Sequence, residues 1–470
     1  MSLQFYNTMS RRKEEFKPIA EGKVGIYNCG PTVYHYPHIG NLRAFIFADL
    51  LKRYLKFKGY EVTQVMNLTD VDDKIIKKCA ETGIPITKYT KTYKQAFFKD
   101  IKTLNIEGAD IYPAATEHIP EMVDLVQRLL DKGLAYKAED GNIFYKIAAF
   151  KNYGKLQRLD MSQMRSGGRV DDDEYEKESA NDFALWKAYK DGDGDVSWDT
   201  ALGKGRPGWH IECSAMSMKY LGETFDIHTG GVDNLFPHHE NEIAQSEGAT
   251  GKHFVNYWLH CEHLLWDNAK MSKSLGNIMY IDGLMEKGYS PAAIRYALLT
   301  THYRQKLNFN LEILDAAEST LKRIDNFLFT LNDTKPGEAD PEIKKIIDTM
   351  LANFEETMDD DLNISGAVGT VFESIKKIQR QFQLTPCTDA SAKLIEKGFH
   401  YADKVLGVIY FREKVEAQLS ETDILAKIEE RNEARANKDW AKADAIRDEL
   451  DAMGIELLDR KDGTGYKIKS

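Results

Sequence analysis

Residues 24–41 read VGIYNCGPTVYHYPHIGN, and this stretch decides the fold that we expect. Residues 24–29 form a short apolar run suited to a buried strand, and residues 41–58 carry apolar side chains at the spacing of one helical face. Residues 61–67, EVTQVMN, have the pattern of a second strand. A strand, a helix and a strand joined by short links form a βαβ unit. We therefore predict an α/β protein with a Rossmann-like parallel sheet.

The loop between the first strand and the helix is a candidate ligand site. Ligands of open α/β sheets lie beyond the carboxyl ends of the strands, and a helix N-terminus offers free N–H groups to phosphate. His35 and His38 add side-chain donors there, and Gly40 permits close approach of the backbone. Taken alone, the loop fits an ordinary turn with incidental histidines equally well.

Length and composition limit the class of protein. A chain of 470 residues predicts two to four domains, and a net charge of −11 argues against a generally basic nucleic-acid protein while leaving room for a local basic face. We find no apolar run long enough to span a membrane and no signal peptide. Five cysteines without repeated spacing predict a reducing, cytoplasmic setting, and Cys79, Cys261 and Cys387 are expected to be ordinary buried thiols.

The pattern along the chain predicts four parts. Residues 1–114 and 206–310 form the sheet domain, and residues 115–205 form an insertion with polar surface loops. Residues 311–415 read as a helical bundle, and residues 416–470 as a small module that ends in a hairpin.

The segment NAKMSKSLGN, residues 268–277, suits a flexible cationic loop. Lys270 and Lys273 flank small hydroxyl side chains, and such a loop can close over a polyphosphate. An arbitrary pair of lysines at this spacing would more often be a solvated turn. The five letters KMSKS, downstream of a loop containing HIG, make the phosphate-binding interpretation more specific.

Several side chains have the chemistry of metal ligands. His238 and Glu242 are four residues apart and share a helical face, while Cys213 lies near His210 and Cys29 ends the first strand. Two thiolates, an imidazole and a carboxylate suit tetrahedral zinc. The spacing is irregular, so the sequence pattern alone supports this site only weakly.

Five segments together resemble the cysteinyl-tRNA synthetase family of class I aminoacyl-tRNA synthetases. They are YNCGPTVYHYPHIGN, NLTDVDDKIIK, GRPGWHIECSAMS, FDIHTGGVDNLFPHHENEIAQSE and KMSKSLGN. The resemblance runs from about residue 3 to the C-terminus. It implies ATP-dependent ligation of L-cysteine to tRNA(Cys) through a cysteinyl-adenylate, with Mg²⁺ accompanying ATP and one zinc ion per chain, and we expect a monomer.

The same resemblance assigns roles to particular residues. ATP would be bound by Pro31, Thr32, His35, His38, Gly40, Asn41, Lys270 and Lys273, with the chemistry at His38, Asn41, Lys270 and Lys273. Zinc would be held by Cys29, Cys213, His238 and Glu242, and would bind the substrate thiolate so that serine is rejected. The substrate would contact Trp209, His210, His228 and Asp233. Asp233 suits either the substrate ammonium or the ATP ribose, and Asn41 stands where the family pattern has histidine.

The resemblance also makes residues 311–415 a tRNA-binding bundle and residues 416–470 an anticodon-reading module. A basic face would comprise Arg431, Arg435, Lys438, Lys442 and Arg447. The alternative is a solvated helix whose charges are balanced by Glu429, Glu430, Asp439, Asp444 and Asp448. Two rival functions are a cysteine:amino-sugar ligase, which would lack the tail, and a non-catalytic relative, which would not need KMSKS.

Overall fold

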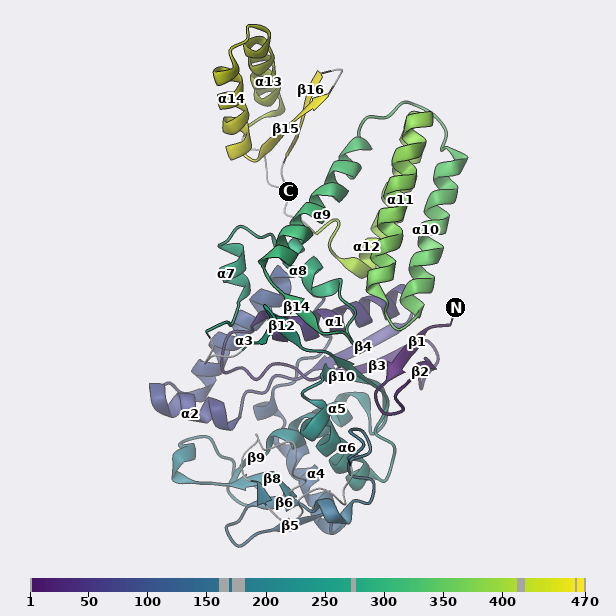
Figure 1. Cartoon of the computed structure of the whole chain (residues 1–470). Helices are drawn as coiled ribbons and strands as arrows, with labels where there is room; N and C mark the ends of the chain where they lie inside the picture. The colour runs from purple at the N-terminus through teal and green to yellow at the C-terminus, as the bar shows by residue number, and fades with distance from the viewer. Residues whose placement is uncertain are drawn as a thin grey trace.

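A four-stranded parallel sheet lies at the centre of the computed structural model, which describes residues 2–159, 169–170, 182–271, 276–411, 419–460 and 463–468. The strand order is β11 (Val255–Cys261), β10 (Phe225–Gly231), β3 (Lys23–Asn28) and β4 (Glu61–Met66) (Figure 1). The predicted parallel sheet is confirmed. Helix α1 (Ile39–Phe57) joins β3 to β4, as the βαβ pattern predicts.

The strand order creates a crevice between β3 and β10. The chain leaves β3 toward β4 on one side, and leaves β10 toward β11 on the other side, so the order reverses between these two strands. Crossover elements diverge at such a point and leave room at the carboxyl ends of the strands. Cys29 follows β3 directly, at this position.

The two faces of the sheet bury separate cores because strand side chains alternate in direction. Ile26 packs in the core that contains the apolar side of α1. Tyr27 packs in the second core, together with residues of α5 (Trp209–Leu221) and α6 (Glu240–Thr250). Cys29 is two residues after Tyr27 and therefore faces the same helices.

The described residues between 115 and 207 build a smaller sheet and one α-helix, which lie below the central sheet in the view of Figure 1. The elements are α4 (Ile119–Asp131), β5 (Ala135–Lys137), β6 (Ile143–Tyr145), β7 (Arg169–Val170), β8 (Asp182–Ala188) and β9 (Gly205–Pro207). The loop predicted over residues 166–182 lies outside the described residues, apart from Arg169, Val170 and Asp182.

Further helices and strands complete the region around the sheet. They are β1 (Gln4–Asn7), β2 (Arg12–Glu15), α2 (Asp73–Thr82), α3 (Ile86–Thr103), β12 (Leu264–Trp266), β13 (Ala269–Lys270), α7 (Ile281–Met285), α8 (Pro291–Leu299) and β14 (Leu307–Phe309). Strands β13, β12 and β14 form a three-stranded sheet after the central one.

The C-terminal third is mainly helical, as predicted. Four long helices, α9 (Leu311–Thr330), α10 (Pro341–Asp359), α11 (Ile364–Leu384) and α12 (Asp389–Leu406), stand above the sheet (Figure 1). Two shorter helices and a hairpin follow: α13 (Glu421–Ala436), α14 (Trp440–Ala452), β15 (Ile455–Arg460) and β16 (Gly463–Ile468). Among the described residues, no helix is long and apolar enough to cross a membrane. The exact division of the chain at residues 114, 205, 310 and 415 stays a prediction.

Candidate functional site

A cavity of about 460 Å³ opens at the carboxyl ends of β3 and β10. Its wall includes twelve of the residues predicted for the site: Cys29, Pro31, Thr32, His35, His38, Gly40, Asn41, Trp209, Cys213, Asp233, His238 and Lys270. His210, His228 and Glu242 are fully buried behind this wall. Lys273 lies outside the described residues. The fold thus gathers segments that are far apart in sequence around one hollow.

Four possible metal ligands converge at the inner end of the cavity. Ligand atoms of Cys29, Cys213, His238 and Glu242 all lie within 4.8 Å of one another. Cys29 follows β3 directly, and Cys213 lies on α5. His238 lies in the helical turn Leu235–His239 and Glu242 in α6, which follows that turn, and His238 Nε2 is 3.1 Å from Glu242 Oε1. Two sulfurs, a nitrogen and an oxygen at this separation fit the donor chemistry of zinc.

Burial shifts the pKa of two of these donors, Cys29 and His238. It raises the pKa of Cys29 well above the ordinary thiol value, and the neighbouring Cys213 raises it further. Burial also lowers the pKa of His238 to about 3, so the imidazole is neutral at pH 7 and keeps a lone pair that it can donate to a metal ion. A cation would relieve the cost of gathering two sulfurs and a carboxylate in this buried space.

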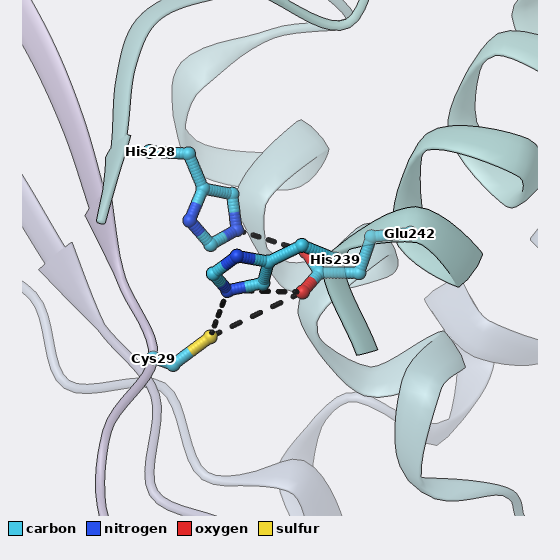
Figure 2. A group of neighbouring side chains, drawn as sticks. All are labelled: Cys29, His228, His239 and Glu242. Atoms are coloured by element: carbon cyan, nitrogen blue, oxygen red, sulfur yellow. Dashed lines mark hydrogen bonds and ion pairs between the residues drawn. The ribbon is translucent and has the colours of Figure 1, made fainter. Parts of the chain in front are cut away.

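A second set of donors overlaps the first and uses Cys29, His228, His239 and Glu242 (Figure 2). His239 Nε2 lies 3.2 Å from Cys29 Sγ, and His228 Nε2 lies 2.9 Å from Glu242 Oε2. Both imidazoles are fully buried and do not line the cavity, so an ion held by them would be out of reach of a substrate. The set with Cys213 and His238 faces the cavity instead. We therefore favour it as the functional site.

Sequence reasoning missed the part played by His239. The only signal was its position in the run PHHE, next to the predicted ligand His238. The ring fits because Gly230 has no side chain: a Cβ there would lie 2.7 Å from His239 Cε1. His239 Nδ1 lies 2.8 Å from His260 Nε2, whose ring in turn contacts Thr8. These contacts fix the orientation of a ring that touches Cys29.

The two histidines predicted to bind substrate lie behind the donors. His210 Nδ1 is 2.8 Å from His238 Nδ1, and His228 is paired with Glu242. Such outer partners orient metal ligands. Trp209 stacks on His238 with 4.2 Å between ring centroids and lines the cavity itself. Direct contact of His210 and His228 with a substrate stays a prediction.

The predicted phosphate loop leads into the N-terminus of α1 through a reciprocal cap. His38 Nδ1 accepts the backbone N–H of Asn41 at 3.2 Å, and Asn41 Oδ1 accepts the backbone N–H of His38 at 3.2 Å. The arrangement satisfies backbone donors that a helix leaves without partners. Asparagine at position 41 therefore has a structural task, and its amide nitrogen remains available to a ligand.

The KMSKS segment begins beside this loop. Lys270 ends β13, is exposed and lies on the cavity wall. Met271 packs where a side chain at Gly40 would be, since a Cβ there would lie 2.7 Å from Met271 Cε. Gly40 thus permits the close approach of Met271 in this structure, and its predicted contact with ATP stays a prediction.

Comparisons with known proteins agree on a family. Residues 15–319 match the model of the class I tRNA synthetase (C) catalytic domain, residues 353–410 match a DALR domain, and residues 423–466 match the cysteinyl-tRNA ligase anticodon binding domain. The chain belongs to the cysteinyl-tRNA synthetase family.

Full-length relatives support the assignment. A cysteine–tRNA ligase of Brachyspira hyodysenteriae is 49% identical over 99% of both chains, and one of Leptospira interrogans is 48% identical over 100% of both. A solved methionyl-tRNA synthetase of Mycobacterium tuberculosis, bound to methionyl-adenylate, has a TM-score of 0.61 at 14% identity and covers 82% of this chain and 90% of its own. The similarity to this methionyl-tRNA synthetase structure shows that the chain has the class I fold.

Several basic side chains of residues 416–470 are paired with carboxylates in the structure. Arg431 is buried and donates two hydrogen bonds to Asp459, at 2.8 and 2.9 Å, and Arg435 lies 2.9 Å from the same carboxylate. Lys442 pairs with Glu430 at 2.9 Å. These three cations of the predicted basic face are therefore balanced by acidic groups. Glu430 is one of the acids that the alternative named, whereas Asp459 on β15 was not among them.

Proposed function

We propose that this protein ligates L-cysteine to tRNA(Cys) in two steps, with ATP and Mg²⁺ as co-substrates and one zinc ion in the amino-acid pocket. The observation that carries the proposal is the placement of Cys29, Cys213, His238 and Glu242 at the inner end of a cavity whose outer part is the loop before α1. Family membership and the class I fold support it. The five unpaired thiols suit the cytosol, and the expectation of a monomer stays a prediction.

In the first step, a carboxylate oxygen of cysteine forms a bond to the α-phosphorus of ATP while pyrophosphate leaves. The carboxylate is already a nucleophile, so the site must position the reactants and stabilise charge. The partial positive charge at the start of α1, His38 and the amide nitrogen of Asn41 are suited to phosphate oxygens, as is the ammonium of Lys270. Lys273 would add a second cation.

Amino-acid selection would depend on the four donors and on Trp209. When bound, zinc would take the substrate sulfur as a thiolate ligand and leave a neutral serine hydroxyl unbound. The ring of Trp209, stacked on His238, would form the apolar wall beside the substrate. Asp233 is exposed on the cavity wall, where its carboxylate can pair with the substrate ammonium or with a ribose hydroxyl.

Pyrophosphate–ATP exchange that depends on cysteine tests the first step. The wild-type protein should exchange with cysteine and not with serine, and should contain about one zinc per chain. Cys213→Ser should lower exchange by more than the roughly 10–100-fold that an outer partner of a metal ligand costs. Cys387→Ser, a buried thiol in the helical part, is the matched control and should behave as wild type. Equal exchange with cysteine and serine, or full exchange without metal, would contradict the proposed selection.

In the second step, the cysteinyl group passes to the terminal ribose of the tRNA. A chain that ends at residue 415 should retain exchange, because the cavity lies elsewhere, and should lose aminoacylation through weaker tRNA binding. Aminoacylation at the wild-type efficiency would contradict the proposed role of the tail. It would favour the amino-sugar ligase, which the matched anticodon binding domain otherwise argues against.

A further inference from the structure

Tyr27 carries a buried hydroxyl that has no partner among the described residues. The side chain is fully buried, and its oxygen is shielded from solvent and has no well-formed hydrogen bond to any described residue, although Cys213 lies near enough to act on it. A buried hydroxyl without a partner is costly, and phenylalanine would fill the same space without that cost. The hydroxyl therefore needs a hydrogen-bonding partner that the described residues do not supply in this arrangement.

The fold places this hydroxyl beside the metal donors. Tyr27 precedes Cys29 by two residues on β3 and pairs in register with His228 on β10, so all three side chains share one face of the sheet. The rings of Tyr27 and His228 lie 5.1 Å apart, edge to face. Cys213 on α5 packs in the same core. Burial raises the pKa of Tyr27 well above its usual value, and the nearby sulfur of Cys213 raises it further.

The other donors already have hydrogen-bonding partners. Cys29 contacts His239 at 3.2 Å, and the two oxygens of Glu242 contact His228 and His238. A neutral thiol accepts hydrogen bonds weakly, whereas a thiolate accepts them strongly. Cys213 becomes such an acceptor when a metal ion displaces its proton.

We propose that Tyr27 is a positioning residue of the metal site, whose O–H donates to the thiolate of Cys213 once the metal is bound. The inference rests on the proposed zinc site and adds to it a residue outside the donor set. Tyr27 would hold the sulfur in place and reduce its negative charge, leaving the metal more able to accept the substrate thiolate. Without the metal, the same unpaired hydroxyl would lower the free energy of unfolding. Metal binding would therefore be coupled to the stability of the sheet.

The test compares Tyr27→Phe with Tyr145→Phe in the full-length protein. Tyr145 is also fully buried, but its hydroxyl donates to the carbonyl of Ala244 at 2.9 Å. We expect Tyr27→Phe to bind zinc about 10–100-fold more weakly, measured by competition with a chelator. In the cobalt-substituted protein, the sulfur-to-cobalt absorption band should shift to longer wavelength, because the thiolate has lost a donor. Tyr145→Phe should leave both the affinity and the band unchanged.

Thermal unfolding without metal supplies a second test, in which we expect the substitution to preserve or raise the melting temperature. Tyr27→Phe should melt at the wild-type temperature or above it, since it removes an unpaired buried hydroxyl, while its gain in melting temperature on adding zinc should be smaller than that of the wild type. An unchanged zinc affinity and cobalt band in Tyr27→Phe would overturn the inference and leave the zinc site standing. A wild-type protein that binds neither metal would overturn both.

Discussion

Asn41 caps α1 through its amide oxygen and lies on the cavity wall, so we propose that its amide nitrogen also serves the phosphate site. A charged histidine at this position could donate to phosphate but could not accept the backbone N–H of His38 through a carbonyl oxygen. The replacement of the family's histidine is therefore physically reasonable. The cap also fixes the backbone that would surround the phosphates.

Substitutions at position 41 can separate the two purposes. Asn41→Ala should slow pyrophosphate exchange by about 100–1000-fold, as for the loss of one donor to a reacting centre. It should also cost about 1 kcal/mol of stability through the lost cap. Asn41→Asp keeps the acceptor, so its melting temperature should stay near that of the wild type while exchange is slow, because a carboxylate repels phosphate. Asn41→His should be well tolerated for exchange. Wild-type exchange by Asn41→Asp would remove the amide nitrogen from the mechanism.

Helix α3 buries a carboxyl group that the fold does not compensate. Asp100 is 8% exposed, and burial together with the carboxylate of Asp282 raises its pKa to about 6. A carboxyl whose pKa is higher in the folded chain than in the unfolded chain binds its proton more tightly when folded. Its contribution to stability therefore decreases as the pH rises from about 4 to about 6, and the penalty is complete at pH 7.

Asp100→Asn should accordingly stabilise the protein at neutral pH and not in acid. We expect a gain of about 1–2 kcal/mol at pH 7, after allowance for solvent screening, and almost none at pH 4. Thermal unfolding at the two pH values measures the difference. Asp282→Asn, at an exposed position, should give a smaller gain with the same pH dependence. An equal gain for Asp100→Asn at both pH values would show that packing rather than charge explains the effect.

At the scale of the whole molecule, Asp361 connects the catalytic region to the helices above it. This fully buried carboxylate lies just after α10 and accepts the backbone N–H of Tyr6 at 2.8 Å and the hydroxyl of Tyr303 at 2.6 Å. Arg304 Nε donates to it at 2.7 Å. The contacts come from β1, from the segment after α8 and from the helical part, so one side chain fixes three regions relative to one another.

Asp361→Asn should weaken this connection while leaving the cavity intact. The amide cannot satisfy Arg304 as a carboxylate does, and we expect a loss of about 1–3 kcal/mol in thermal unfolding. Exchange should persist, whereas aminoacylation should fall, because tRNA must reach the tail and the cavity together. Asp360→Asn changes the neighbouring, more exposed carboxylate and is the matched control. Unfolding of Asp361→Asn at the wild-type temperature would contradict the connecting role.

The sequence by itself determined the parallel sheet, the course of α1 and the helical C-terminal third, because each depends on local apolar periodicity. Short motifs likewise marked the loop before α1 and the lysine-containing segment. The resemblance to a family named Cys29, Cys213, His238 and Glu242, although their spacing alone supported a metal site only weakly. Irregular spacing is what a site assembled across a sheet must show, since its members come from separate elements.

Only the tertiary structure decided how these residues are arranged. It placed His210 and His228 behind the donors, added His239 to a second donor set, left the hydroxyl of Tyr27 unpaired and joined Arg431 to Asp459. Each of these outcomes depends on which side chains meet after strands and helices pack. Periodicity reports the face on which a residue lies, but distances and hydrogen-bonding partners between segments far apart in the chain are set by packing.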